Sequence, residues 1–125
     1  MSSFGHRARR LPASIGGVTG RIVRVWKGYG TAIGVERYCR DHFAKTVLPK
    51  LKTVDGFLDA TILVRPLGEH TELVVATVWE SLDSVKTFAG DRYEHAVVEP
   101  VVRDLLEHFE DEVVHFHVAL TAAGG

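Results

Sequence analysis

The chain has 125 residues, of which 46% are hydrophobic and 25% charged, with a formal net charge of −1. These values are typical of one globular domain and exclude an intrinsically disordered protein. Acidic and basic residues are mixed along the chain, so no basic face predicts nucleic-acid binding, and no apolar run approaches the ~18 residues that would predict a membrane span. The single cysteine, Cys39, excludes an internal disulfide and indicates a reducing, cytoplasmic location.

The two ends of the chain differ in composition from its middle. Residues 1–20 are rich in Gly, Ser and Arg and show no periodicity, so we expect a flexible N-terminal leader whose basic groups are solvated or touch anionic groups. Residues 21–120 carry the periodic hydrophobic pattern of a domain, and residues 121–125 form a short tail. The sequence therefore predicts one domain between a leader and a tail.

The first half of the domain predicts a strand followed by a long helix. Arg21–Lys27 alternates, with Val23 and Val25 on one face and Ile22, Arg24 and Trp26 on the other. Thr31–Lys52 has helical periodicity, and Pro49 should kink or restart this helix near its end. The inward side of the helix is predicted to carry Val35, Tyr38, Cys39, His42, Phe43 and Val47.

Two further strands and a short helix follow. Phe57–Arg65 and Thr71–Glu80 are rich in β-branched residues and are separated by a loop over residues 66–70, which predicts an antiparallel hairpin. Ser81 can then cap a helix that runs to Ala89 and ends at Gly90. The hairpin and this helix form the centre of the predicted domain.

The last third predicts one more helix and one more strand. The helix begins at Pro100, with Val101, Val102, Leu105, Leu106 and Phe109 inward. The strand covers Glu112–Leu120. The whole order is that of an α+β, ferredoxin-like split β-α-β arrangement, in which a four-stranded antiparallel sheet has helices on one face.

The sheet face opposite the helices is predicted to be apolar. We expect Ile22, Trp26 and Val113 on this face. Because an uncovered apolar face usually marks a partner surface, the sequence predicts a homodimer that packs sheet against sheet and closes into a dimeric α/β barrel.

Several short motifs occur in a distinctive order. They are Lys27-Gly28 after the first strand, a helix with Tyr38 and Pro49, Gly56-Phe57-Leu58, the TVWES run at residues 77–81, Phe88-Ala89-Gly90, Ala96-Val97-Val98 and Val114-His115-Phe116. Together they resemble the antibiotic biosynthesis monooxygenase (ABM) domain over residues 21–120.

The resemblance implies a dimeric α/β barrel and a choice of chemistries. The family includes oxygenases that oxidise aromatic polyketide-type substrates to quinones without a cofactor, haem-degrading enzymes and members with no known activity. In the oxygenases and haem degraders the residue that matches Trp79 helps to line a pocket, and both use an asparagine on the first strand. This chain contains no asparagine, and no histidine on the helix after TVWES clearly matches the haem ligand.

Three residues are the candidates for catalysis. Tyr38, His42 and Trp79 are expected to face one another between the helix and the sheet, where His42 could take a proton from a phenol whose anion then reacts with O2. The alternative is that both aromatic residues fill the core and that His42 is a hydrogen-bonded core histidine.

Weaker candidates for substrate binding lie on the first and last predicted strands and in a loop. His115 and His117 share a strand face that is expected to point into the barrel with Arg24 and Trp26. A His-x-His pair can bind a metal, but no third ligand is evident, so a polar interface is the other interpretation and no metal is predicted. Arg24 could hold an anionic substrate or form an ion pair, and Tyr93 and His95 could form a pocket rim.

The sequence thus predicts an ABM-type monooxygenase that acts on a small aromatic or apolar molecule without a bound cofactor. The alternative is a dimeric barrel that binds a small molecule, or has a stress-associated role, without catalysis. Haem binding is a third interpretation.

Overall fold

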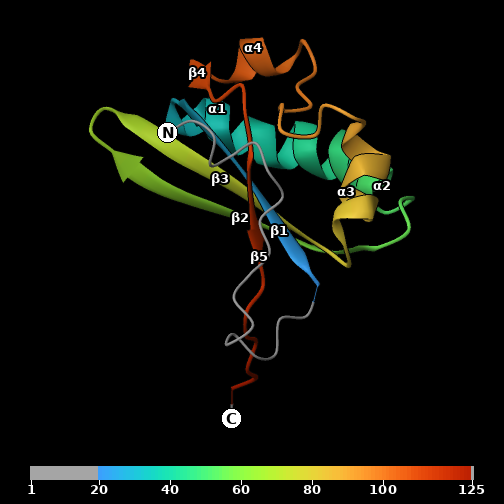
Figure 1. The fold of residues 1–125 in the computed structure, drawn as a ribbon. Coiled ribbons are helices and arrows are strands. Elements are labelled where there is room, and N and C mark those ends of the chain that lie inside the picture. Colours follow the sequence, from blue (N-terminus) through green and yellow to red (C-terminus); the bar gives the residue numbers. More distant parts are fainter. Residues whose placement is uncertain (1–19, 125) are drawn as a thin grey trace, which may run out of the picture.

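The computed structural model describes residues 20–124, so the predicted leader lies, apart from Gly20, outside the described residues. These residues form an antiparallel sheet with helices gathered on one side (Figure 1). The strands are β1 (Ile22–Gly30), β2 (Phe57–Leu67), β3 (His70–Trp79), β4 (His108–Phe109) and β5 (Val114–His117). The helical elements are α1 (Ala32–Arg37), η2 (Tyr38–Val47), α2 (Leu48–Leu51), α3 (Leu82–Ala89) and α4 (Val102–Leu105).

The sheet has β1 at its centre. The strand order is β2-β3-β1-β4, and β5 also pairs with β1. The register places Gly28 opposite Phe109 of β4 and Val25 opposite Val114 of β5. Because β4 and β5 occupy successive stretches along the same edge of β1, they act as one interrupted fourth strand. The ferredoxin-like α+β prediction is confirmed, while the last strand predicted over residues 112–120 is shorter, Val114–His117, and β4 forms in the stretch predicted as helix.

The long helix between β1 and β2 changes its hydrogen-bonding pattern along its length. Thr31 caps α1 by accepting a hydrogen bond from the Gly34 amide at 3.0 Å. The middle segment, η2, is a π-helix, in which backbone bonds run from residue i to residue i+5. This wider turn brings Tyr38, His42, Phe43 and Val47 onto the side that faces the sheet. The predicted inward position of His42 is confirmed, because only 6% of it is exposed.

The β2–β3 hairpin is tighter than the predicted five-residue loop. The strands extend to Leu67 and His70, which leaves only Gly68 and Glu69 in the turn. Gly68 has a φ of 62°, as the first residue of a type II′ turn requires. The α3 helix follows β3 as predicted, with Ser81 as its N-cap and Gly90 as its C-cap.

The helix predicted from Pro100 is shorter than expected, and the predicted inward helical positions of Val101 and Phe109 were wrong. Only Val102–Leu105 is helical, Phe109 belongs to β4, and Val101 is 43% exposed. The helix ends early because the following residues pair with the free edge of β1. The Glu107 amide donates to the Tyr29 carbonyl at 2.8 Å, so the chain must become extended at Leu106 to enter the sheet.

The predicted assignment of the two sheet faces was also wrong. Ile22, Trp26 and Val113 are buried in the core on the helix side of the sheet, not on the opposite face. Alternation alone could not decide this, because both faces of β1 are apolar. The face away from the helices, called the open face below, carries instead Val23, Val25, Leu63, Val74, Ala76, Val78, Val114 and Phe116.

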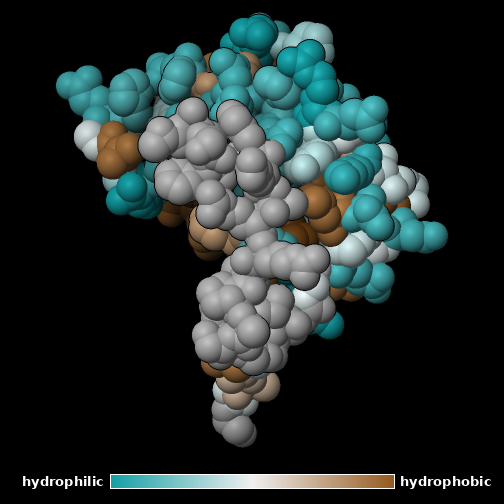
Figure 2. Space-filling view, in the orientation of Figure 1, coloured by the Kyte–Doolittle hydropathy of each residue, from teal (hydrophilic) through white to brown (hydrophobic). Residues whose placement is uncertain are grey.

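The hydrophobic core lies between the sheet and the helices. Trp79, Leu73 and Val85 are fully buried there. In the view of Figure 2, hydrophilic side chains dominate the upper part, where α1 and α4 lie, and hydrophobic ones reach the surface in the middle. Within residues 20–124, no helix is long and apolar enough to cross a membrane.

Candidate functional site: a cavity between the sheet and the helices

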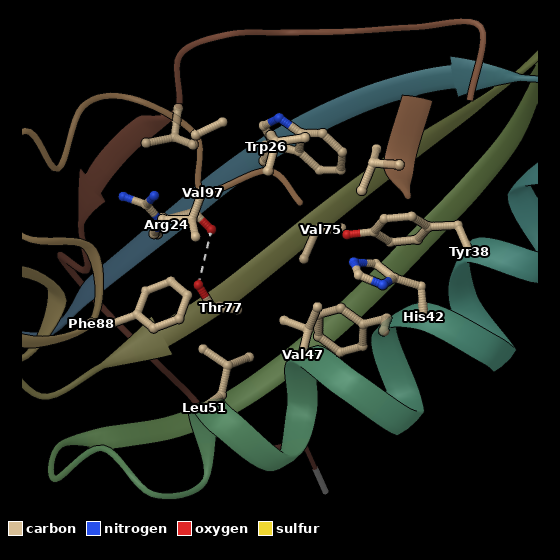
Figure 3. Close-up of a pocket in the computed structure, with 15 residues that line it drawn as sticks. Arg24, Trp26, Tyr38, His42, Val47, Leu51, Val75, Thr77, Phe88 and Val97 are labelled. Atoms are coloured by element: carbon tan, nitrogen blue, oxygen red, sulfur yellow. Dashed lines mark hydrogen bonds between the residues drawn. The ribbon is translucent and has the colours of Figure 1, made fainter. Parts of the chain in front are cut away.

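A cavity lies between the helix side of the sheet and η2 (Figure 3). Water-molecule centres can occupy about 60 Å³ of it, and the whole hollow with its open mouth measures about 550 Å³. The residues that line it are Arg24, Trp26, Tyr38, His42, Phe43, Val47, Leu51, Val75, Thr77, Phe88, Ala96, Val97, Val98, Val102 and Val113. A mostly apolar wall with a few polar groups is typical of small-molecule sites.

The aromatic wall of the cavity comes from Trp26 and Tyr38. Their ring centroids are 5.7 Å apart, and the Trp26 Nε1–H donates to the Glu110 carbonyl at 2.8 Å. This bond satisfies the indole's polar group and fixes the ring against the cavity. A flat apolar molecule would therefore meet a rigid aromatic surface.

His42 is the base candidate at this end of the cavity. Its Nε2 lies 3.5 Å from Oε1 of Glu99, whose other carboxylate oxygen accepts from Lys50 Nζ at 2.7 Å. Burial lowers the pKa of His42, and Lys50 lowers it further, while Glu99 opposes the shift. His42 is therefore neutral at pH 7 and can accept a proton, and Glu99 is placed to stabilise the imidazolium that would form.

The Tyr38 hydroxyl is a free hydrogen-bonding group inside the cavity. Tyr38 is only 5% exposed, its ring centroid is 5.4 Å from that of His42, and its hydroxyl points into the cavity (Figure 3). It makes no hydrogen bond to another residue in the described part of the chain. Burial raises the pKa of Tyr38, so the hydroxyl stays protonated and can donate to a ligand.

Arg24 lies at the other end of the cavity, beside Phe88 (Figure 3). Its Nη1 donates to the Tyr93 carbonyl at 2.6 Å and lies 3.1 Å from Nε2 of His115, and its Nη2 donates to the His95 carbonyl at 3.2 Å. Burial lowers the pKa of Arg24 to about 10, so the guanidinium is still charged at neutral pH.

His115 serves as a neutral acceptor for this guanidinium. Burial and the charge of Arg24 lower the pKa of His115 to about 4. Because an arginine can only donate, Nε2 of His115 must carry the lone pair and Nδ1 the proton. The imidazole thus helps to position Arg24.

The other predicted binding residues lie outside the cavity. His95 and His117 have exposed side chains, and Tyr93 packs edge-on against His115 with a centroid distance of 5.6 Å. The register confirms that His115 and His117 share a sheet face with Arg24 and Trp26, but the prediction that this face points into a barrel interior was wrong, because it is the helix side of the sheet. Among residues 20–124, no three His, Cys, Asp or Glu side chains gather as a metal site.

Of the three residues expected to share one site, the structure brings two together at the cavity. Tyr38 and His42 adjoin, but Trp79 is fully buried and does not line the cavity. Its Nε1–H donates to Thr77 Oγ1 at 2.9 Å, and its ring packs between Phe57 and Phe88. Trp26 supplies the indole that Trp79 was expected to supply.

Sequence reasoning missed Phe88 and Glu99 as parts of this site. Phe88 could have been found from the helical spacing that turns it inward with Val85. Glu99 could not have been found in this way, because it lies in a segment without regular secondary structure, whose position the sequence pattern does not predict.

Solved structures share this fold over most of the chain. A dimeric ferredoxin-like protein from an uncultured marine organism matches with a TM-score of 0.61 at 12% identity, covering 82% of this chain and 98% of that one. The ActVA-Orf6 monooxygenase of Streptomyces coelicolor, solved with nanaomycin D, matches at 0.54 and 18% identity, covering 89% and 96%. The haem degrader MhuD of Mycobacterium tuberculosis, solved with two haems, matches at 0.53 and 19% identity, covering 82% and 99%.

The sequence matches no protein-family model and, at a significant level, none of the curated proteins. A Bacillus cereus structure assigned to the antibiotic biosynthesis monooxygenases is also among the structural matches. The chain therefore has the fold of an ABM-like domain. Identities below 20% in these matches show the fold, which is shared by an oxygenase and a haem degrader, and leave the reaction to the site.

Proposed function

We propose that this domain binds a small aromatic molecule in the cavity and oxidises it with O2 without a bound cofactor. The observation that carries the proposal is the pair of His42 and Tyr38, a neutral imidazole and an unpartnered hydroxyl, both buried at one end of an aromatic-walled cavity. No fully buried side-chain nitrogen or oxygen atom of residues 20–124 lacks a hydrogen-bond partner, so the unpartnered Tyr38 hydroxyl must reach the open space of the cavity, where a ligand can meet it.

The chemistry would begin at the hydroxyl group of a bound phenol. His42 accepts the phenolic proton, Glu99 stabilises the imidazolium, and Tyr38 donates a hydrogen bond to the phenolate oxygen. The electron-rich phenolate then reduces O2 directly. In the balanced reaction, the ring C–H opposite the hydroxyl becomes a carbonyl to give a quinone, and the second oxygen atom leaves as water.

Oxygen uptake tests this proposal. We expect purified protein to consume O2 in the presence of 1-naphthol or anthrone, and His42→Ala to abolish uptake because no other imidazole lines the described cavity. His117→Ala is the matched control, since that imidazole is exposed and outside the cavity. Unchanged uptake by a folded His42→Ala protein would remove His42 as the base.

The second candidate function is binding without catalysis. It is favoured by the small space open to water inside the cavity, about 60 Å³, and by the absence of asparagine from the sequence. Binding of 1-naphthol with no O2 uptake under any condition would support this function. Haem binding is weakened by the lack of histidine on α3, and haem titration followed by the Soret band tests it.

We also propose that the open face of the sheet is the homodimer surface. Leu63, Val114 and Phe116 on this face are each 55% exposed, and the strands between them carry Val23, Val25, Val74, Ala76 and Val78 on the same face. A continuous apolar surface of this kind usually binds a partner, and a second copy offers a surface of the same chemistry. The marine ferredoxin-like protein with the same fold is dimeric, which supports the proposal.

A further inference from the structure

Arg24 is a buried cation without a carboxylate partner. Only 6% of the residue is exposed, and no Asp or Glu in residues 20–124 forms an ion pair with it. Its three polar partners are two backbone carbonyls and the neutral imidazole of His115. The Phe88 ring also lies under the guanidinium, with its centroid 5.9 Å from Cζ, but it carries no negative charge. Burying a charge is costly unless a counter-charge is present, and an anion bound here would supply one.

The guanidinium also has hydrogen-bonding capacity to spare. An arginine has five N–H donors, and the contacts to Tyr93, His95 and His115 use three of them. The remaining two, the Nε–H and one Nη2–H, have no partner in the described part of the chain. Two neighbouring charged donors suit a carboxylate, which offers two acceptor oxygens.

Arg24 lines the cavity, so its two spare N–H donors belong to the same site as Tyr38 and His42. Arg24 and Phe88 lie at one end, and Tyr38 and His42 lie at the other, with Val75 on the floor between them (Figure 3). A ligand that reaches both ends would place an aromatic body over the apolar floor.

We propose that the ligand of this cavity is an aromatic carboxylic acid, with its carboxylate bound by Arg24 and its hydroxyl group at His42. This inference rests on the proposed function of the cavity as a ligand site. It narrows the ligand class from aromatic molecules in general to those with an acidic group at one end.

A purely structural role for Arg24 is the competing explanation. In that role the guanidinium only ties the segment of Tyr93 and His95 to β1 through its carbonyl bonds. Such a role needs neither the charge nor the two spare donors, and it predicts no preference among ligands. Ligand selectivity therefore separates the two roles.

The experiment is isothermal titration with two probes of nearly equal shape, 2-naphthoate and the neutral 2-naphthamide. We expect the wild-type protein to bind 2-naphthoate roughly ten- to hundredfold more tightly. Arg24→Met, which removes the charge and keeps the length, should lose this preference while still binding 2-naphthamide. Arg24→Lys should keep part of it, and Arg40→Met, on the exposed side of η2, should not change it.

The outcomes distinguish this inference from the function on which it rests. If 2-naphthamide binds and 2-naphthoate binds no more tightly, the carboxylate site is overturned and the cavity remains a ligand site. If neither probe nor 2-naphthol binds, the proposed function is overturned as well. Should Arg24→Met fail to fold, the wild-type preference and its retention in Arg24→Lys decide the matter.

Discussion

The two faces of the sheet differ in what they bury. The helix side mixes large apolar side chains with buried polar ones, among them Arg24, His42 and Thr77. The open face is aliphatic in its centre, several of its side chains are half exposed, and a buried charged group on it, Glu72, pairs with Arg65 near the β2–β3 hairpin. The same strands form both faces, so the difference comes from which residue types alternate to each side and not from the backbone.

This difference separates two roles within one small domain. Buried polar groups around a cavity provide directional contacts for a ligand, whereas an aliphatic surface provides area without direction. This difference supports the proposal that the ligand binds on the helix side and that a second subunit packs on the open face. Changes on one face should leave the property of the other intact.

The largest expected effect comes from the core of the helix side. Trp79→Ala should lower the free energy of unfolding by about 3–5 kcal/mol, because the fully buried indole packs against Phe57 and Phe88 and its loss leaves a cavity. Chemical denaturation measures this. Ile33→Ala, at a residue that is 67% exposed, is the control and should change stability by less than about 0.5 kcal/mol. A loss at Trp79 as small as at Ile33 would contradict the packing described.

The open face is tested by a charge on its edge strand β5. Phe116→Asp should weaken self-association by about 2–4 kcal/mol, because a carboxylate would be buried in an aliphatic interface. Light scattering during gel filtration should then show a monomer for the variant and a dimer for the wild type. Ile33→Asp, at an apolar position on α1 that is 67% exposed, should remain dimeric. A monomeric wild-type protein would end the dimer proposal.

Acid should destabilise the helix side through its histidines. The pKa of His115 is lowered to about 4 in the folded chain, against its usual 6.5, so the unfolded chain binds more protons between these values. Stability is therefore fully present above pH 6.5 and falls as the pH drops toward 4. Discounted for the partial exposure of His115, the loss in the free energy of unfolding is about 2 kcal/mol. The lowered pKa of His42 adds to this loss in the same direction.

His115→Gln should flatten this pH dependence. The glutamine amide oxygen can still accept from Arg24 but does not titrate, so the melting temperature should fall less steeply between pH 6.5 and pH 4 than in the wild type. An equally steep fall in the variant would show that other groups cause the acid sensitivity.

The smallest effect is expected at Glu99. Because Glu99 raises the pKa of His42 against the effect of burial, Glu99→Gln should lower the pKa of His42 further. The pH profile of O2 uptake, or NMR titration of the His42 ring, would show the change. A pKa that stays constant or rises would mean that Glu99 does not act on His42.

Much of the fold could be predicted from the sequence because its signals are local. Ser81 and Gly90 cap α3 as their residue types indicate, and the β-branched run before Trp79 forms the strand expected. The π-helical course of η2 could not be predicted, since spacings of four residues fit both helix types. Because residues four apart share a face in either helix type, the predicted inward positions of Tyr38 and His42 were still correct.

The site was predicted only in part because its geometry depends on long-range placement. Trp26 and Trp79 both alternate inward on neighbouring strands, and only the paths of η2 and α3 decide which indole lines the cavity. The apolar character of both faces of β1 likewise left the orientation of Arg24 open. Which face meets the helices is a property of the whole packing and not of the strand.

The most direct test of the central claim is a crystal structure of the protein soaked with 1-naphthol. We predict the naphthyl ring in the cavity between Trp26 and Phe88, with its hydroxyl group within hydrogen-bonding distance of His42 or Tyr38. A ring bound only on the open face of the sheet, with the cavity filled by water or by rearranged side chains, would contradict the claim that this cavity is the ligand site.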